Sequence, residues 1–256
     1  MLYGICNLSI VALRKEASHK SEMTNQVLFG EHFEILENQQ KWSRIKLAFD
    51  GFEGFIDNKQ FTSISYKEYQ MLSEGNVSYS AELVDFITNV NNELTTITIG
   101  AVLPLLKETE CELSDETYSY QGAIFSGKLD KSAILKTSFT FLNCPYLCGG
   151  KSPFGIDCSA FTQMVYKLCG YQLQRNVIEQ AAQGEVLSFI EESEPGDLAF
   201  FDNEEGEIVH VGVILNNYNI IHVHDKVRID SLDHSGIFNT DLQKHTHKLR
   251  VIKKIV

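Results

Sequence analysis

The sequence predicts an α+β fold for the C-terminal half of the chain, preceded by one or two small β-barrels. Short strand-like runs separated by glycine turns fill the first 64 residues, and a similar pattern returns over residues 80–127. After residue 128 the apolar spacing becomes helical, and strand-like runs follow beyond residue 196. A helical segment followed by consecutive strands is typical of an α+β domain.

The first 64 residues are typical of a small barrel of short strands. Apolar residues alternate loosely over residues 42–47, and a turn at Asp50-Gly51 separates this run from Gly54-Phe-Ile56. We expect Trp42 to lie in the barrel core. The segment resembles a bacterial SH3-like domain in the following residues: Leu13-Arg14, Gly30-Glu31, Trp42 and Gly51-Phe-Glu-Gly-Phe-Ile56.

The next segment has the character of a second barrel. Residues 66–78 are polar and predict a linker or a short helix. The β-branched run 94–100 is followed by residues 102–106, in which Pro104 marks a strand edge. A second, degenerate SH3-like barrel is therefore expected. The predicted domains are 1–64, 65–128 with this second barrel and the linker, and 129–256.

The C-terminal segment begins with helical spacing. Apolar residues predict a helix within residues 129–142 and a second helix from Cys158 to Gly170, with Gly170 as its C-cap. Three strands are predicted after these helices, at residues 198–201, 209–215 and 219–223.

Cys158 stands at the predicted start of a helix, where a thiol becomes reactive. The helix dipole favours an anion there, so we expect a lowered pKa for the Cys158 thiol. A nucleophilic thiol also needs an imidazole that takes its proton and a polar group that orients the imidazole. His210 opens one predicted strand. The next strand offers His222 and His224, which lie on one face because they are two residues apart.

Three ordered blocks of sequence resemble the NlpC-type cell-wall cysteine peptidases. The blocks are Pro145-Tyr146 to Asp157-Cys158-Ser159, Pro195-Gly-Asp-Leu198 to His210-Val-Gly212, and Ile221-His222. Asp-Cys-Ser alone is a weak motif, whereas three blocks in order are specific. The resemblance covers residues 129–250 and implies a papain-like α+β fold. It also implies hydrolysis of the bond between γ-linked D-glutamate and a diamino acid in murein peptides.

The resemblance also assigns roles to single residues. Cys158 matches the nucleophile of the family, His210 its base, and His222 the third, orienting residue. Only the resemblance selects His222 over His224. Tyr146 matches a tyrosine that lines the active site and helps to bind the oxyanion, together with the backbone N–H of Cys158.

Further positions match residues that hold the substrate. Asp157 and Ser159 match such residues in relatives with this domain layout. Asn176 stands where the family often has Asp, which weakens the expected grip on the amino group of the substrate. Cys148 stands where relatives often carry Trp. These departures leave open which diamino acid is accepted.

Glu53 lies in a predicted turn of the first barrel. In relatives with this layout the SH3-like module closes one end of the peptidase cleft. The resemblance therefore implies that the Glu53 carboxylate pairs with a free N-terminal ammonium of the substrate. Tyr66 and Tyr69 are weaker candidates for the same role.

Composition excludes several classes of partner. The formal net charge is −12 and no Lys/Arg cluster is present, so we expect neither nucleic acid nor a membrane surface as a partner. The six cysteines are sparse and predict free thiols. No Cys-x-x-Cys pair occurs, so we predict no metal site and no cofactor. We expect the remaining histidines of this segment at the surface, namely His224, His234, His245 and His247. The first residues lack the features of a secretory signal, which favours the cytoplasm.

The leading functional prediction is an endopeptidase that trims free, released murein peptides. One alternative is a secreted enzyme that cuts intact cell wall and uses the barrels as wall anchors. Another is a non-enzymatic wall-binding module, which the complete set of Cys158, His210 and His222 argues against. The oligomeric state does not follow from the sequence.

Overall fold

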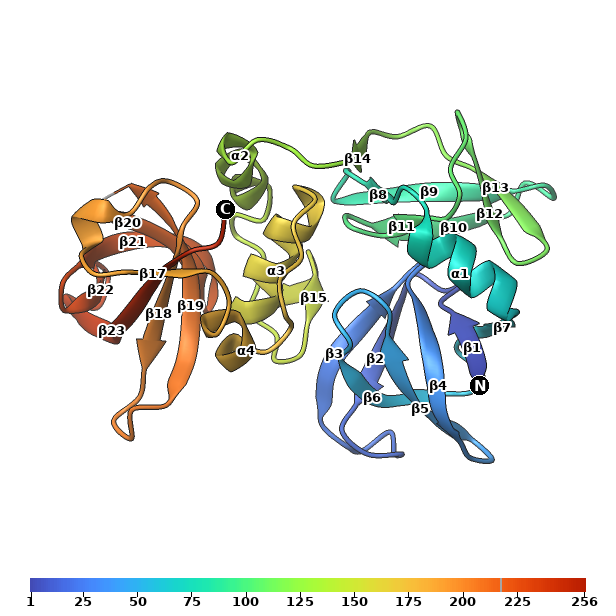
Figure 1. Ribbon diagram of the computed structural model, residues 1–256, viewed down its shortest axis with the longest axis horizontal. Coiled ribbons are helices and arrows are strands. Elements are labelled where there is room, and N and C mark those ends of the chain that lie inside the picture. The colour runs from blue at the N-terminus through green and yellow to red at the C-terminus, as the bar shows by residue number, and fades with distance from the viewer. Residues whose placement is uncertain (217) are drawn as a thin grey trace. The chain divides into compact units, whose positions relative to one another are not determined.

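The computed structural model describes residues 1–216 and 218–256, which form two compact units. The first unit contains Met1–Gly127 together with Cys148–Pro153, and the second contains Lys128–Leu147 and Phe154–Val256 (Figure 1). Both predicted barrel segments thus lie in one unit. The loop 148–153, which the sequence placed in the peptidase domain, also belongs to that first unit.

An antiparallel sheet forms the N-terminal part of the first unit, in the order β3-β2-β6-β5-β4-β1-β7. Its strands are β1 (Leu2–Ile5), β2 (Ile10–Arg14), β3 (Met23–Leu28), β4 (His32–Asn38), β5 (Trp42–Leu47), β6 (Glu53–Asp57) and β7 (Thr62–Ile64). Alternate residues of β2 and β4, among them Leu13 and Phe33, point into one apolar core. Trp42 is buried, as the sequence predicted.

Helix α1 (Tyr66–Glu74) connects this sheet to the second group of strands. Its start is fixed by a capping box, in which Ser65 Oγ accepts the N–H of Glu68 and the Glu68 carboxylate accepts the N–H of Ser65. The strands that follow are β8 (Ser78–Ser80), β9 (Val84–Asn89), β10 (Leu94–Thr98), β11 (Val102–Leu103), β12 (Glu110–Leu113), β13 (Glu116–Ser119) and β14 (Ile124–Ser126).

These later strands form two sheets, in the orders β10-β9-β13-β12 and β11-β8-β14. Their apolar side chains share a core with the first sheet, since Ile5 and Phe29 cluster with Ile87 and Ile97. This shared core explains why residues 1–127 form one unit. The likeness of the second group of strands to an SH3 domain stays a prediction.

The second unit combines three helices with a curled antiparallel sheet. The helices are α2 (Ser132–Thr140), α3 (Cys158–Leu168) and α4 (Val177–Ala181), and a short 3-10 helix, η1, spans Ile190–Glu192. The strands are β16 (Gly155–Ile156), β17 (Glu185–Leu187), β18 (Leu198–Asp202), β19 (Ile208–Asn216), β20 (Asn219–His224), β21 (Lys226–Asp233), β22 (Gly236–Asn239) and β23 (Lys244–Lys254). The remaining strand, β15 (Lys151–Ser152), lies in the loop that belongs to the first unit.

The sheet of the second unit runs β17-β23-β18-β19-β20-β21-β22, and β22 also pairs with β23, so the sheet curls back on itself. Helices α2, α3 and α4 all contact β19 (Figure 1). The predicted helices correspond to α2 and α3, and the predicted strands to β18, β19 and β20. Strands β21, β22 and β23 were not predicted from the sequence, and two of them carry residues of the site.

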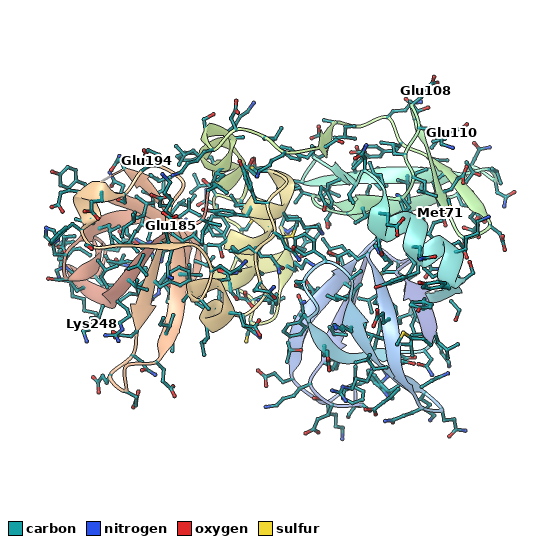
Figure 2. The ribbon with its side chains drawn as sticks, in the orientation of Figure 1. Met71, Glu108, Glu110, Glu185, Glu194 and Lys248 are labelled. Carbon is teal, nitrogen blue, oxygen red and sulfur yellow. The ribbon has the colours of Figure 1, made fainter. Side chains whose placement is uncertain are left out.

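Several acidic side chains lie at the surface of the molecule. Figure 2 shows Glu108, Glu110 and Glu185, all of which are exposed. Among the residues that the structure describes, no helix combines the length and the apolar character that a membrane crossing requires.

Candidate active site

Cys158 is the first residue of α3, and Asp157 fixes that position. Asp157 has an extended backbone, and its Oδ1 accepts the N–H of Ala160 at 2.8 Å, which makes it the N-cap. The guanidinium of Arg175 binds both carboxylate oxygens, at 3.0 Å and 2.6 Å, and is almost fully buried. The paired and capped Asp157 therefore holds the start of the helix, and Cys158 with it.

The sulfur of Cys158 lies against β19. The backbone groups of Val211 and Ser159 hydrogen-bond to it, and Val211 directly follows His210 in the chain. Burial, with the neighbouring Asp157 carboxylate, raises the pKa of the Cys158 thiol to about 12. The expectation of a lowered pKa was therefore wrong, because loss of hydration outweighs the helix N-terminus.

His210 lies on β19 and is only 6% exposed. Gly212 allows the neighbouring strand to approach, because a Cβ there would lie 2.8 Å from the Cβ of His222 and 2.7 Å from Cδ1 of Ile220. Gly212 is paired with His222 in the sheet. The glycine of the His-Val-Gly block therefore makes room for the second imidazole.

The two imidazoles form a chain that ends on a carboxylate. Nε2 of His210 lies 2.9 Å from Nδ1 of His222, and Nε2 of His222 lies 3.0 Å from Oδ2 of Asp230. An ionised carboxylate only accepts, so His222 carries its proton on Nε2 and offers Nδ1 as the acceptor. His210 must then donate from Nε2, which leaves Nδ1 as its basic nitrogen. This arrangement gives His210 the tautomer that a general base requires.

Asp230 is suited to its place at the end of this chain of hydrogen bonds. Burial alone would raise the pKa of Asp230, but hydrogen bonds from His222 and Arg228 outweigh it and lower the pKa below the ordinary value. Asp230 was missed from the sequence. The turn at Asp225, which has φ 61°, joins β20 to β21 and pairs His222 with Arg228. Recognition of that hairpin would have placed Asp230 on the same face as Arg228, next to His222.

His247 is a second addition from a strand that the sequence did not predict. Its ring stacks on that of His210, with centroids 4.1 Å apart and an interplanar angle of 27°. Burial, followed by the nearby His222 and His224, lowers the pKa of His247 to about 4. Burial, His247 and His222 hold the pKa of His210 well below 6.5. The expectation that His247 is a plain surface residue was wrong, because β23 brings its ring onto His210.

The site thus contains a thiol at a helix start, a neutral imidazole on the adjacent strand and an imidazole–carboxylate pair behind it. Residues 143–248 match the family model described as NlpC/P60 family, and residues 13–61 match the model described as bacterial dipeptidyl-peptidase Sh3 domain. This chain carries an NlpC/P60 domain. The predicted NlpC-type domain in the C-terminal segment, the SH3-like first domain and the α+β fold class are confirmed.

Relatives of known name support this assignment. The gamma-D-glutamyl-L-lysine dipeptidyl-peptidase of Bacillus subtilis is 40% identical over 91 residues, 35% of this chain and 30% of that protein. The protein of the same name from Bacillus cereus is 24% identical over 230 residues, 80% of this chain and 68% of that protein. This chain thus matches less than a third of the length of the Bacillus subtilis relative. A crystal structure of an NlpC/P60 family protein from Bacillus cereus has a TM-score of 0.83 at 17% identity and covers 99% of each chain, which shows the fold.

The other predicted residues of the NlpC/P60 domain have structural partners. Ser159 is buried, donates to Asp157 at 3.2 Å and accepts from Arg175 at 2.8 Å. Asn176 is the N-cap residue of α4, and its Nδ2 lies 3.2 Å from a carboxylate oxygen of Glu179. Tyr146 is 51% exposed. The roles of Tyr146, Asp157, Ser159 and Asn176 toward a substrate stay predictions.

The predicted residues of the SH3-like domain also have partners within their own unit. Oε2 of Glu53 lies 2.6 Å from Nη2 of Arg44 on the neighbouring strand. Tyr66 and Tyr69 pack on Tyr3, with ring centroids 5.5 Å and 4.4 Å away. Recognition of a substrate ammonium by Glu53 must therefore compete with Arg44 for the carboxylate.

Proposed function

We propose that this chain hydrolyses the bond between γ-linked D-glutamate and a diamino acid in free murein peptides such as L-Ala-γ-D-Glu-diamino acid. The observation that carries the proposal is the chain of hydrogen bonds from His210 through His222 to Asp230, beside a cysteine at a helix start. This arrangement suits nucleophilic acyl transfer.

In the first half of the proposed reaction, Sγ of Cys158 bonds to the γ-carbonyl carbon while its proton passes to Nδ1 of His210. The carbonyl oxygen becomes an oxyanion, which the N–H of Cys158 in the first turn of α3 and the hydroxyl of Tyr146 are suited to bind. Collapse of this intermediate breaks the C–N bond. The leaving amine of the diamino acid takes the proton from His210, and a thioester remains on Cys158.

In the second half, His210 takes a proton from water, and the hydroxide attacks the thioester carbonyl. The C–S bond breaks, the sulfur of Cys158 takes the proton back from His210, and the γ-carboxylate of D-glutamate is released. The neutral resting pair of thiol and imidazole is consistent with this scheme, in which charge develops only during attack.

The names of the relatives support the choice of bond. Two proteins named gamma-D-glutamyl-L-lysine dipeptidyl-peptidase match this chain, and the first domain matches the SH3 model of bacterial dipeptidyl-peptidases. Hydrolysis of released peptides, rather than of intact cell wall, was predicted from the sequence and belongs to the same proposal. The cytoplasmic location also stays a prediction, and cell fractionation is its test.

Product masses from defined peptides test the proposal. The full chain is incubated with L-Ala-γ-D-Glu-L-Lys, with the matching diaminopimelate peptide and with purified cell wall. We expect release of L-Ala-D-Glu from the peptides, and Cys158→Ala should lower the rate by roughly 10⁴-fold or more. Cleavage at another bond, or equal turnover by Cys158→Ala, would reject the proposed reaction. Ready clearing of cell wall would favour the secreted alternative, and binding without turnover would favour the wall-binding module.

A further inference from the structure

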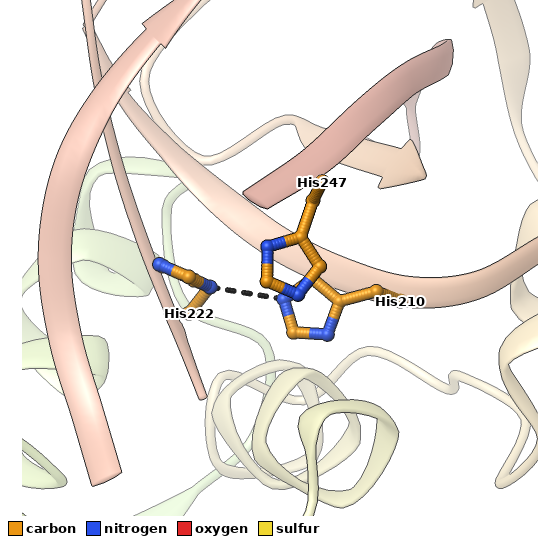
Figure 3. A group of neighbouring side chains, drawn as sticks. All are labelled: His210, His222 and His247. Atoms are coloured by element: carbon orange, nitrogen blue, oxygen red, sulfur yellow. Dashed lines mark hydrogen bonds between the residues drawn. The ribbon is translucent and has the colours of Figure 1, made fainter. Parts of the chain in front are cut away.

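Three histidines from three strands converge within the second unit. His210 comes from β19, His222 from β20 and His247 from β23 (Figure 3). One ligand nitrogen from each ring lies within 4.8 Å of the others. The proposed peptidase reaction uses only His210 and His222, and it assigns no role to His247.

Three imidazole nitrogens are a preferred ligand set for zinc and similar divalent ions. The sequence does not predict such a set, because these histidines are separated by 12 and 25 residues and lack any metal-binding spacing. We propose that His210, His222 and His247 form an inhibitory site for a divalent transition metal of the zinc class.

The surroundings of the ligands fit this proposal. Nε2 of His222 is hydrogen-bonded to Asp230, which leaves Nδ1 of His222 as its nitrogen in the group of three. A metal-bound histidine commonly donates its other N–H to a carboxylate, which orients the ring. Nδ1 of His247 lies 2.9 Å from the hydroxyl of Thr246, which leaves Nε2 of His247 as the nitrogen for an ion.

The distances require a small rearrangement of the group, in which the closest pair of nitrogens widens and the most distant pair approaches. Zinc binds imidazole nitrogen at about 2.0–2.1 Å with tetrahedral geometry, which sets the ligand nitrogens roughly 3.3 Å apart. The His210–His222 pair is at 2.9 Å, and the widest separation in the group is below 4.8 Å. The His247 ring must also tilt out of its stack on His210, whose interplanar angle is 27°, because the lone pair of an imidazole nitrogen lies in the plane of the ring. Three protein ligands leave a fourth tetrahedral position for another donor.

An ion bound at this site would inhibit the proposed reaction, because it changes which nitrogen of His210 carries the proton. The ion takes the place of the proton that Nε2 of His210 shares with His222. Neutral His210 then carries its proton on Nδ1, the nitrogen that must accept the proton of Cys158 in the proposed reaction. The metal therefore blocks the base without touching the sulfur. Only this inhibitory effect depends on the proposed function, and binding of the ion does not.

Binding is measured first, on the full chain carrying Cys158→Ala. Calorimetry with Zn²⁺ and absorption spectra with Co²⁺ report occupancy in the absence of turnover and of the thiol. We expect one ion per chain, bound as a tetrahedral Co²⁺ complex. Adding His247→Phe, which keeps a stacking ring, should weaken binding by roughly 100-fold or more, because it removes one of three ligands. The control is His224→Phe, which should leave binding unchanged.

Inhibition is measured second, with the cysteine intact. Zn²⁺ should stop hydrolysis of the tripeptide and EDTA should restore it. For His247→Phe, whatever its rate without metal, the ratio of the rates with and without Zn²⁺ should stay near one. Absence of binding to the Cys158→Ala chain would overturn the proposal. Equal zinc sensitivity of His247→Phe and the unmodified chain would also overturn it, because the ion would then be held by Cys158 and His210 instead. Failure of the tripeptide assay alone would reject the proposed function but not the metal site.

Discussion

The ammonium of Lys151 lies 2.7 Å and 3.1 Å from the two carboxylate oxygens of Glu31, although 120 residues separate them in the chain. Both side chains are buried, at 1% and 5% exposure. The backbone N–H of Lys151 also donates to Oε1 of Gln26 at 2.7 Å. Gly149, with φ 73°, passes so close to β3 that a Cβ there would lie 2.2 Å from the carbonyl oxygen of Met23. The loop 148–153, which precedes Cys158, is thus anchored within the first unit.

Breaking this ion pair from one side should destabilise the protein. Removal of one partner of a buried pair typically costs about 3–5 kcal/mol, because the other charge stays buried. We expect that range for Lys151→Met and for Glu31→Gln in urea denaturation of the full chain. The double variant Glu31→Gln with Lys151→Met should recover most of the loss, since no charge is then buried and the amide oxygen can still accept the N–H of Leu28. The exposed ion pair of Glu37 and Arg44 provides the control, and Glu37→Gln should leave the unfolding midpoint nearly unchanged. Equal effects of the buried and the exposed substitution would contradict this view.

Asp230 should act as a positioning residue for His222. Asp230→Ala removes the acceptor that fixes the tautomer of His222, so Nδ1 of His222 is no longer held as the acceptor for Nε2–H of His210. We expect kcat to fall by roughly 10–100-fold with little change in KM, as for other partners that orient a ligand or base. Asp230→Asn can still accept the N–H of His222 through its amide oxygen and should retain more activity than Asp230→Ala. Asp233→Ala on the same strand serves as the control. It breaks an exposed pair with His245 and two hydrogen bonds from the backbone N–H groups of Ser235 and Gly236, and none of these partners belongs to the chain from His210 to Asp230. A larger loss from Asp233→Ala would contradict the role of Asp230.

His222 should matter more to turnover than His224, although strand alternation puts both on one face. His222 is fully buried and hydrogen-bonded to His210, whereas the ring centroid of His224 lies 6.3 Å from that of His222. We expect His222→Ala to lower kcat by about 100-fold or more, because the base loses its orientation, and His224→Ala to change it only slightly. Steady-state kinetics on the same peptide compare the two. The reverse order would mean that the third residue is His224.

The sequence predicted those parts of the site that lie in local motifs. Cys158 and its helix follow from the Asp-Cys-Ser block. His210 follows from the strand-like run that it opens and from the His-Val-Gly block. Asp230 and His247 were missed because β21 and β23 are rich in polar and charged residues, which hide the strand period. The raised pKa of Cys158 was missed for a different reason. Desolvation depends on the tertiary packing of α3 against β19, which a helix-start motif does not contain.

The pH dependence of alkylation tests the resting state of Cys158. Burial raises the pKa of this thiol to about 12, so its thiolate fraction is small at pH 6 and increases only as the pH rises toward that value. Iodoacetamide at pH 6 should therefore label the exposed Cys148 before Cys158. Labelling of Cys158 in the folded protein should increase steeply above pH 8. Mass spectrometry of the labelled peptides measures this increase. Selective labelling of Cys158 at pH 6 would instead establish a thiolate–imidazolium pair in the resting site.

The last prediction concerns a substrate with a free N-terminal amine. We expect Glu53 to bind that ammonium, and its carboxylate must then turn from Arg44 to the substrate. Charged hydrogen bonds that are partly desolvated favour the cation by roughly ten- to a hundredfold in kcat/KM. We therefore expect L-Ala-γ-D-Glu-L-Lys to be cut faster than its N-acetylated form by that factor, and Glu53→Gln to raise KM and narrow the preference.

The chain offers a matched control for this substitution. Glu37 binds the same guanidinium, with its Oε1 2.8 Å from Nη1 of Arg44, so Glu37→Gln removes the same kind of ion pair from the same arginine. If Glu53 acts through its own carboxylate, Glu37→Gln should leave the ratio of kcat/KM for the free and the acetylated peptide unchanged. If the two substitutions narrow the ratio equally, Arg44 or the shape of the barrel sets the preference. Equal kcat/KM for both peptides in the unmodified chain would contradict recognition of the free amine, because a carboxylate that binds the ammonium must discriminate against the uncharged amide.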